Sequence, residues 1–146
     1  MRLEAKNLSF SYDVKGRQIL RQFSLSADSS ERVGIIAPSG FGKTTLCKIL
    51  SGYEAPQIGE VLLDGKPLSE YGAYCPIQMI CQHPEQAVNP RLRTKNVIEE
   101  GVRTAPDLIE NLAIEPAWIN RFPTALSSGP LQPFRIASTL RQTTRI

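Results

Sequence analysis

The chain has 146 residues, of which 41% are hydrophobic and 21% charged, and its net charge at pH 7 is +3. These values are typical of a soluble globular protein with room for one domain and a core of its own. The small positive excess gives no reason to expect nucleic acid as a partner, and no apolar run approaches the length of a membrane span. The N-terminal residues contain no apolar signal region, so we expect a cytoplasmic protein.

The cysteine pattern argues against metal binding and disulfides. The three cysteines, Cys47, Cys75 and Cys81, are odd in number and have no C-x-x-C spacing. We expect them to be reduced thiols. The single histidine, His83, cannot build a metal site alone.

The N-terminal part of the chain predicts three strands. Residues 2–11 alternate loosely between polar and apolar side chains, which indicates a strand with one apolar face. A second strand is expected over residues 18–27, after a turn at residues 13–16. The apolar run at residues 33–36 suits a buried strand.

A glycine-rich loop follows this run directly, and a segment with helical spacing extends from it to about residue 51. The loop reads Ala37-Pro38-Ser39-Gly40-Phe41-Gly42-Lys43-Thr44-Thr45. A strand, a glycine-rich turn ending in Gly-Lys-Thr, and a helix form the expected context of a phosphate-binding loop. Backbone N–H groups of such a loop turn towards a phosphate chain, and the helix N-terminus adds partial positive charge.

Several residues of this loop are candidate nucleotide contacts. Lys43 is expected to reach the β- and γ-phosphates, and the Thr44 hydroxyl to take one position on Mg²⁺. Ala37 stands where the pattern has its first glycine, and its Cβ narrows the backbone options there. The alternative is a glycine turn that caps a helix and binds nothing, which the flanking elements argue against. The expected contacts are Ser39, Gly40, Gly42, Lys43, Thr44 and Thr45.

The rest of the chain predicts two more strands and then helices. A short strand is expected over residues 59–63, closed by a turn, and a buried strand over residues 77–81. Residues 94–104 and 106–114 read as two short amphipathic helices. Strands around one phosphate loop, followed by a helical part, form an α/β pattern.

With these elements placed, the chain resembles the ATP-binding subunit of ABC transporters over its whole length. The phosphate loop is the first of four features that occur in the family's order. Tyr12 is the second, because the family places an aromatic residue there that stacks on adenine, a contact worth ~1–3 kcal/mol. From the residues alone, a core tyrosine on the face of Leu8 and Phe10 is the preferred interpretation.

The third feature is Gln82, which follows the expected strand at residues 77–81. In the family a glutamine at this point reaches the metal and the attacking water, so the resemblance implies catalytic and metal-binding roles. An amide can ligate Mg²⁺ and accept from water without adding charge. The Q-x-P at this point and the later Asn89-Pro90-Arg91 resemble the branch that powers peptide and nickel uptake, although they also read as a proline-punctuated loop.

The fourth feature is residues 126–132, Leu-Ser-Ser-Gly-Pro-Leu-Gln, which are similar to the family signature Leu-Ser-Gly-Gly-Gln. In the family this element opens a helix and caps the ATP of the other subunit in a head-to-tail dimer. The resemblance therefore implies Ser127 and Gly129 as nucleotide contacts. Because proline suits only the first helical turn, Pro130 and Pro133 together predict a distorted helix start and weakened capping.

The resemblance implies a P-loop NTPase of the ABC type that is incomplete, with an antiparallel β subdomain and a helical insert. The strand ending in Asp-Glu and the later histidine of the family do not occur, so we expect roughly the N-terminal three-fifths of such a subunit. Residues 1–92 would be the nucleotide-binding core and residues 93–146 the helical subdomain. Without the missing strands, residues 33–36 and 77–81 would be open edges, which predicts a marginal, association-prone chain.

The leading hypothesis is an ATP-binding component of a peptide or nickel importer that binds MgATP without hydrolysing it. Its partners would be membrane-spanning permease subunits and a second ATP-binding subunit, at the inner face of the cell membrane. One alternative is a non-catalytic binding partner of a membrane subunit or of an intact homologue. Another is a decayed gene product.

Overall fold

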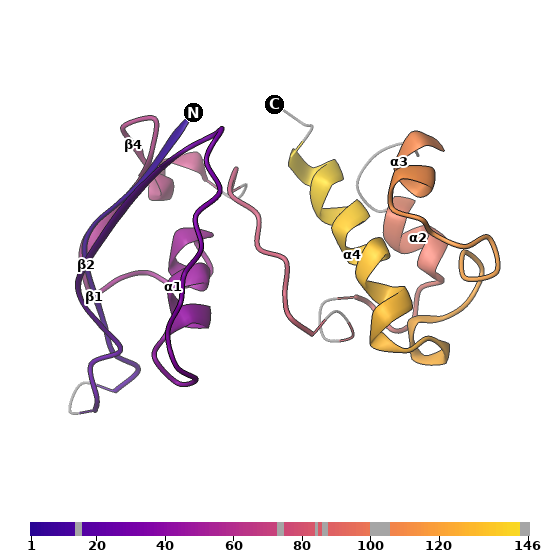
Figure 1. Ribbon diagram of the computed structural model, residues 1–146, viewed down its shortest axis with the longest axis horizontal. Coiled ribbons are helices and arrows are strands. Elements are labelled where there is room, and N and C mark those ends of the chain that lie inside the picture. The colour runs from indigo at the N-terminus through magenta and orange to yellow at the C-terminus, as the bar shows by residue number, and fades with distance from the viewer. Residues whose placement is uncertain (14–15, 73–74, 84, 86–87, 100–105, 144–146) are drawn as a thin grey trace. The chain divides into compact units, whose positions relative to one another are not determined.

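The computed structural model describes residues 1–13, 16–72, 75–83, 85, 88–99 and 106–143 (Figure 1). The chain divides into two compact units, Met1–Ile77 and Gln78–Ile146. Each unit has a hydrophobic cluster of its own.

The first unit is built on a four-stranded antiparallel sheet with the strand order β2-β1-β3-β4. In the register of the sheet, Leu3 of the inner strand β1 lies opposite Ala27 on one side and Leu63 on the other. A short 3₁₀ helix, η1 (Leu68–Tyr71), follows the last strand. The strands are β1 (Arg2–Phe10), β2 (Leu20–Asp28), β3 (Ile58–Leu63) and β4 (Lys66–Pro67).

Strand β1 departs from simple alternation near its end. Leu8, Ser9 and Phe10 are all buried, and Asn7 has a φ of 51°. The register with β2 shifts between Ala5 and Leu8, and again between Leu8 and Phe10. Such bulges re-aim the side chains that follow them, so the loose alternation of the sequence reflects an irregular strand.

Helix α1 (Lys43–Leu50) packs against this sheet (Figure 1). Leu46 and Ile49 are three residues apart and therefore share one face of the helix. Full burial of one such side chain is worth about 1.5–3 kcal/mol, so this face holds α1, and the loop before it, in place on the sheet. The buried cluster contains Ala5, Leu8, Phe10, Leu20, Leu46, Ile49 and Val61.

The two buried strands expected over residues 33–36 and 77–81 are not found. Neither run has regular secondary structure, and neither takes part in the described sheet pairings. Ile36 is 98% exposed and Ile80 is 47% exposed. A strand is stable only where a neighbouring strand accepts and donates its backbone hydrogen bonds. The prediction is wrong here because an apolar pattern does not itself supply that neighbour.

The second unit is helical, with α2 (Thr94–Glu99), α3 (Pro106–Asn111), the 3₁₀ helix η3 (Pro123–Ala125) and α4 (Ser128–Thr143). Helix α2 packs beside α4. The helix expected over residues 94–104 is present as α2, and its residues 100–104 lie outside the described part of the chain, while the helix expected over residues 106–114 is present but ends at Asn111. The buried cluster contains Ile98, Ile114, Phe134 and Ala137.

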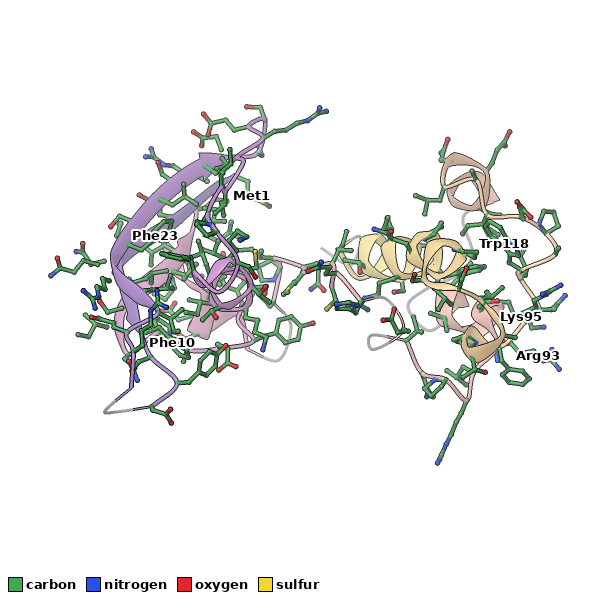
Figure 2. All side chains as sticks on the ribbon, turned by 60° about the horizontal axis from the view of Figure 1, so that its bottom comes forward. Met1, Phe10, Phe23, Arg93, Lys95 and Trp118 are labelled. Carbon is green, nitrogen blue, oxygen red and sulfur yellow. The ribbon has the colours of Figure 1, made fainter. Side chains whose placement is uncertain are left out.

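A hydrogen-bonded junction fixes the start of α2 to the segment before η3. The buried Thr94 hydroxyl lies 2.6 Å from the carbonyl oxygen of Trp118 and 2.9 Å from that of Ile119. The Lys95 amide also donates to Ile119, at 2.9 Å. Figure 2 labels Lys95 and Trp118 on the two segments that meet here. Beside them, the guanidinium of Arg93 lies 4.8 Å from the ring centroid of Phe122 and donates to the carbonyl of Asn120.

Helix α4 is continuous from Ser128 to Thr143, with Pro133 inside it. Pro130 lies in the first turn, where its missing N–H would have no intrahelical partner in any case. The amide of Leu131 donates to the Ser127 carbonyl at 3.3 Å, which closes that first turn. Helix α4 continues through Pro133 in its second turn, so the expected distortion does not interrupt the helix. None of the described helices is long and apolar enough to cross a membrane.

Candidate functional site

The phosphate loop turns through two glycines in the left-handed region. Gly40 has a φ of 80° and Gly42 a φ of 83°, values that glycine adopts without the penalty of a Cβ. A Cβ at Gly42 would also lie 2.5 Å from Cγ2 of Ile19, whereas one at Gly40 would have nothing within 4 Å. Conformation therefore requires glycine at both positions, and space requires it at Gly42 as well.

Ala37 does not strain the loop. It is half-buried and is not among the residues with positive φ, so its backbone conformation is one that alanine adopts freely. The alanine in place of the pattern's first glycine is compatible with the loop shape.

Lys43 closes the loop from the first position of α1. Its Nζ donates to the carbonyl oxygens of Ala37, at 2.6 Å, and Pro38, at 2.9 Å. An ammonium group has three donors, so one donor is left for an anion. Lys43 therefore both shapes the loop and keeps a charged donor for a ligand.

The N-terminus of α1 supplies further donors. Gly42 is its N-cap and offers no side-chain cap, and the first turn contains no acidic residue. The amide of Leu46 donates to the Gly42 carbonyl at 2.8 Å, while the amides before it have no intrahelical acceptor. Together with the helix dipole, these open amides make the N-terminus suited to an anion such as phosphate.

Two hydroxyls on α1 differ in their surroundings. Thr45 is buried, and its Oγ1 lies 3.2 Å from the hydroxyl of Tyr12. Thr44 is exposed. A hydroxyl is a suitable single ligand for Mg²⁺, which keeps most of its coordination for water and phosphate oxygens, so Thr44 fits a nucleotide-bound magnesium ion.

Tyr12 lies beside the phosphate loop rather than in the core. Its side chain is 58% exposed, and its ring meets Phe10 edge to face, with 5.0 Å between the ring centroids. Phe10 itself is buried at the end of β1 (Figure 2). The exposure of Tyr12 disfavours a core role and leaves ring surface for a base to stack on, which stays a prediction.

The other predicted site residues belong to the second unit. Gln82, Ser127 and Gly129 are exposed, and Ser127 directly precedes α4. The structure brings Tyr12 together with the phosphate loop, and it gives no placement of that loop relative to these three residues. Within the described ranges, no group of three or more His, Cys, Asp or Glu side chains could hold a metal ion. A metal here would depend on hydroxyl, amide and phosphate oxygens.

One residue at the loop was missed by the sequence reasoning. Arg17 lies just before β2, and its guanidinium carbon is 5.1 Å from the ring centroid of Phe41. The two residues are far apart in sequence, and no motif links them. Only the pairing of β1 with β2 brings this arginine to the loop.

A loop with left-handed glycines and a lysine, at the uncapped start of a helix packed on a sheet, defines a phosphate-loop protein. The ABC transporter family model matches residues 20–146. The chain belongs to the ABC transporter family.

Two curated relatives illustrate this membership. The nickel import ATP-binding protein NikE of Escherichia coli (strain K12) is 29% identical over 140 residues, which cover 84% of this chain and 52% of NikE. The peptide transport system ATP-binding protein SapF of Salmonella typhimurium is 29% identical over 161 residues, which cover 94% of this chain and 60% of SapF. The chain therefore spans a little over half the length of these relatives.

Solved structures show the same fold. The structure of an ATP binding subunit of an ABC transporter matches with a TM-score of 0.77 at 22% identity, covering 97% of this chain and 62% of that one. The dimeric ATP-binding cassette MJ0796, bound to ADP and Pi, matches with a TM-score of 0.79 at 23% identity, covering 96% of this chain and 69% of that one. The predicted fold class, an α/β cassette of the ABC type represented in part, is confirmed.

Proposed function

We propose that this chain is a MgATP-binding component of an ABC importer. The observation that supports it most is Lys43, which closes the loop through two carbonyls and keeps a donor beside the open amides of α1. Lys43 binds the β- and γ-phosphates, and Thr44 ligates Mg²⁺. Tyr12 stacks on the adenine. The loop contacts are completed by Ser39, Gly40, Gly42 and Thr45.

The proposal extends to the partners. The relatives are named for nickel import and peptide transport, so we assign the chain to an importer of one of these cargo classes, with permease subunits at the inner face of the membrane. A dimeric cassette among the structural neighbours supports a second ATP-binding subunit. Ser127 and Gly129 contact the nucleotide of that subunit, and Gln82 contacts the metal and water. Residues 1–92 bind nucleotide and residues 93–146 form the helical subdomain.

We further propose binding without turnover. Phosphoryl transfer depends on positioned groups that order the metal and the attacking water. The described residues contain no acidic cluster that could hold the metal.

Isothermal titration calorimetry of the full chain with MgATP tests the phosphate-loop assignment. Lys43→Ala removes a charged partner of a phosphate, which should cost about 1.5–3 kcal/mol, or about 10- to 150-fold in affinity. Lys48→Ala is the matched control, because Lys48 lies in the last turn of α1, at the other end from the phosphate loop. Its Nζ is 4.0 Å from Oε1 of Glu54. Equal affinity of wild type and Lys43→Ala would refute the assignment. Lys43-dependent phosphate release would refute binding without turnover.

A second candidate function has its own supporting observation. Val33, Ile35 and Ile36 are exposed apolar side chains in a run outside the described sheet, which suits a chain that docks on an intact homologue. Co-expression with such a homologue, followed by sizing chromatography, would show a stable complex that Ile36→Lys weakens. If no complex forms while nucleotide binding is intact, the docking function is refuted and the nucleotide-binding function stands.

A further inference from the structure

A second cation lies at the phosphate loop. The guanidinium carbon of Arg17 is 5.1 Å from the ring centroid of Phe41. Phe41 lies between Gly40 and Gly42, and the residue is 54% exposed. The arginine is exposed as well, so the charged group stands at the solvent-facing side of the loop.

The segment around Arg17 is held against the loop by other contacts. The Ile19 amide donates to the Phe10 carbonyl at 2.8 Å, which ties this segment to the end of β1. Cγ2 of Ile19 lies 2.5 Å from the ideal Cβ position at Gly42. Position 17 is therefore set by the β1–β2 connection and by close contact of Ile19 with the loop.

The other arm of the same connection also reaches the loop. The hydroxyls of Tyr12 and Thr45 are 3.2 Å apart. The connection between β1 and β2 thus touches the phosphate loop and α1 from both arms, with an aromatic hydroxyl on one and a guanidinium on the other.

The guanidinium of Arg17 can bind an anion. Arg17 takes part in none of the ion pairs found among the described residues. Contact with an aromatic face attracts the cation without using its N–H donors. Those donors form a planar fork that matches two phosphate oxygens, whereas the ammonium of Lys43 acts as a point charge.

We propose that Arg17 is a second cationic contact for the phosphate chain of the nucleotide, held in readiness by the ring of Phe41. The inference rests on the proposed binding of MgATP. Lys43 binds from the start of α1, and Arg17 binds from the β1–β2 connection. The pair surrounds the phosphate chain with positive charge from two separate elements.

The test titrates the full chain with MgATP and, separately, with magnesium tripolyphosphate, which carries phosphates but no base or ribose. Arg17→Ala should weaken both by about two- to fivefold at low salt, and the difference should shrink in high salt because exposed charges are screened. Phe41→Ala should weaken both by a smaller factor. Arg21→Ala is the matched control, since Arg21 is an exposed arginine on β2 and should leave both affinities unchanged.

Thermal melting of every variant accompanies the titrations, and Arg17→Gln, which keeps a planar group over the ring, replaces Arg17→Ala if the latter does not fold. Unchanged affinity in the folded variant, with binding lost in Lys43→Ala, would overturn the role of Arg17 and leave the proposed function standing. Loss for MgATP but not for tripolyphosphate would place Arg17 on the base or ribose and overturn the phosphate contact. A wild-type chain that binds neither probe would overturn both proposals.

Discussion

Replacing Gly42 by alanine separates two physical reasons for glycine in the phosphate loop. Gly42 has a φ of 83°, and a Cβ there would lie 2.5 Å from Cγ2 of Ile19. The left-handed conformation costs a residue with a Cβ about 1–2 kcal/mol, and overpacking adds about 1–3 kcal/mol. We expect Gly42→Ala to lower the free energy of unfolding by about 2–5 kcal/mol, a large part of a domain's usual ~5–15 kcal/mol.

Gly40→Ala is the matched control for this substitution. Gly40 has nearly the same φ, 80°, but nothing lies within 4 Å of its ideal Cβ position. Gly40→Ala should therefore lower the free energy of unfolding only by the conformational cost, about 1–2 kcal/mol. A double-mutant cycle with Ile19→Ala should recover the steric part at Gly42 as a coupling energy of about 1–3 kcal/mol.

Urea unfolding of the full chain, followed by far-ultraviolet circular dichroism, measures these differences. The single tryptophan, Trp118, lies in the second unit. The urea transition followed by its fluorescence is therefore an internal control, and Gly42→Ala should leave the midpoint of that transition unchanged. MgATP titration of the same variants reports whether the loop keeps its binding shape. Equal destabilisation by Gly40→Ala and Gly42→Ala, with no coupling to Ile19, would refute the steric argument.

Two other predictions concern each unit in turn. Thr94→Val removes a buried hydroxyl that lies within hydrogen-bonding distance of the carbonyls of Trp118 and Ile119. The free energy of unfolding measured by tryptophan fluorescence should therefore fall by about 1–3 kcal/mol. The control Thr124→Val, at an exposed threonine, should change it by less than about 0.5 kcal/mol, and an equally small change in Thr94→Val would contradict the prediction. The exposed apolar run around Ile36 should make the wild-type chain associate, and Ile36→Lys should raise the monomer fraction in sizing chromatography more than Ile58→Lys on a paired strand does. A monodisperse wild-type monomer with a sharp melt would show that the run is not an open edge.

The phosphate loop could be read from the sequence because its chemistry is local. Residues 37–45 place two glycines, a lysine and two threonines within a few residues of one another, so the turn and the start of α1 follow from local backbone conformation. The strands near residues 2–11, 18–27 and 59–63 were predicted from their apolar patterns, and they exist because they pair with one another.

Tertiary structure decided the features that depend on contacts with other segments of the chain. The runs at 33–36 and 77–81 are as apolar as strands, yet a strand exists only where another chain segment accepts its backbone hydrogen bonds. Helix α4 runs through Pro133 in its second turn, although the sequence rule confines proline to the first turn.

The sequence by itself determined the phosphate loop and, through resemblance, the family. Only the tertiary structure brought Tyr12 to Thr45 and Arg17 to Phe41, because both contacts need the pairing of β1 with β2 and the packing of α1 on the sheet. Local backbone chemistry acts between residues adjacent in sequence, whereas a charge or ring from elsewhere reaches the loop only after hydrophobic burial has placed both elements on one core.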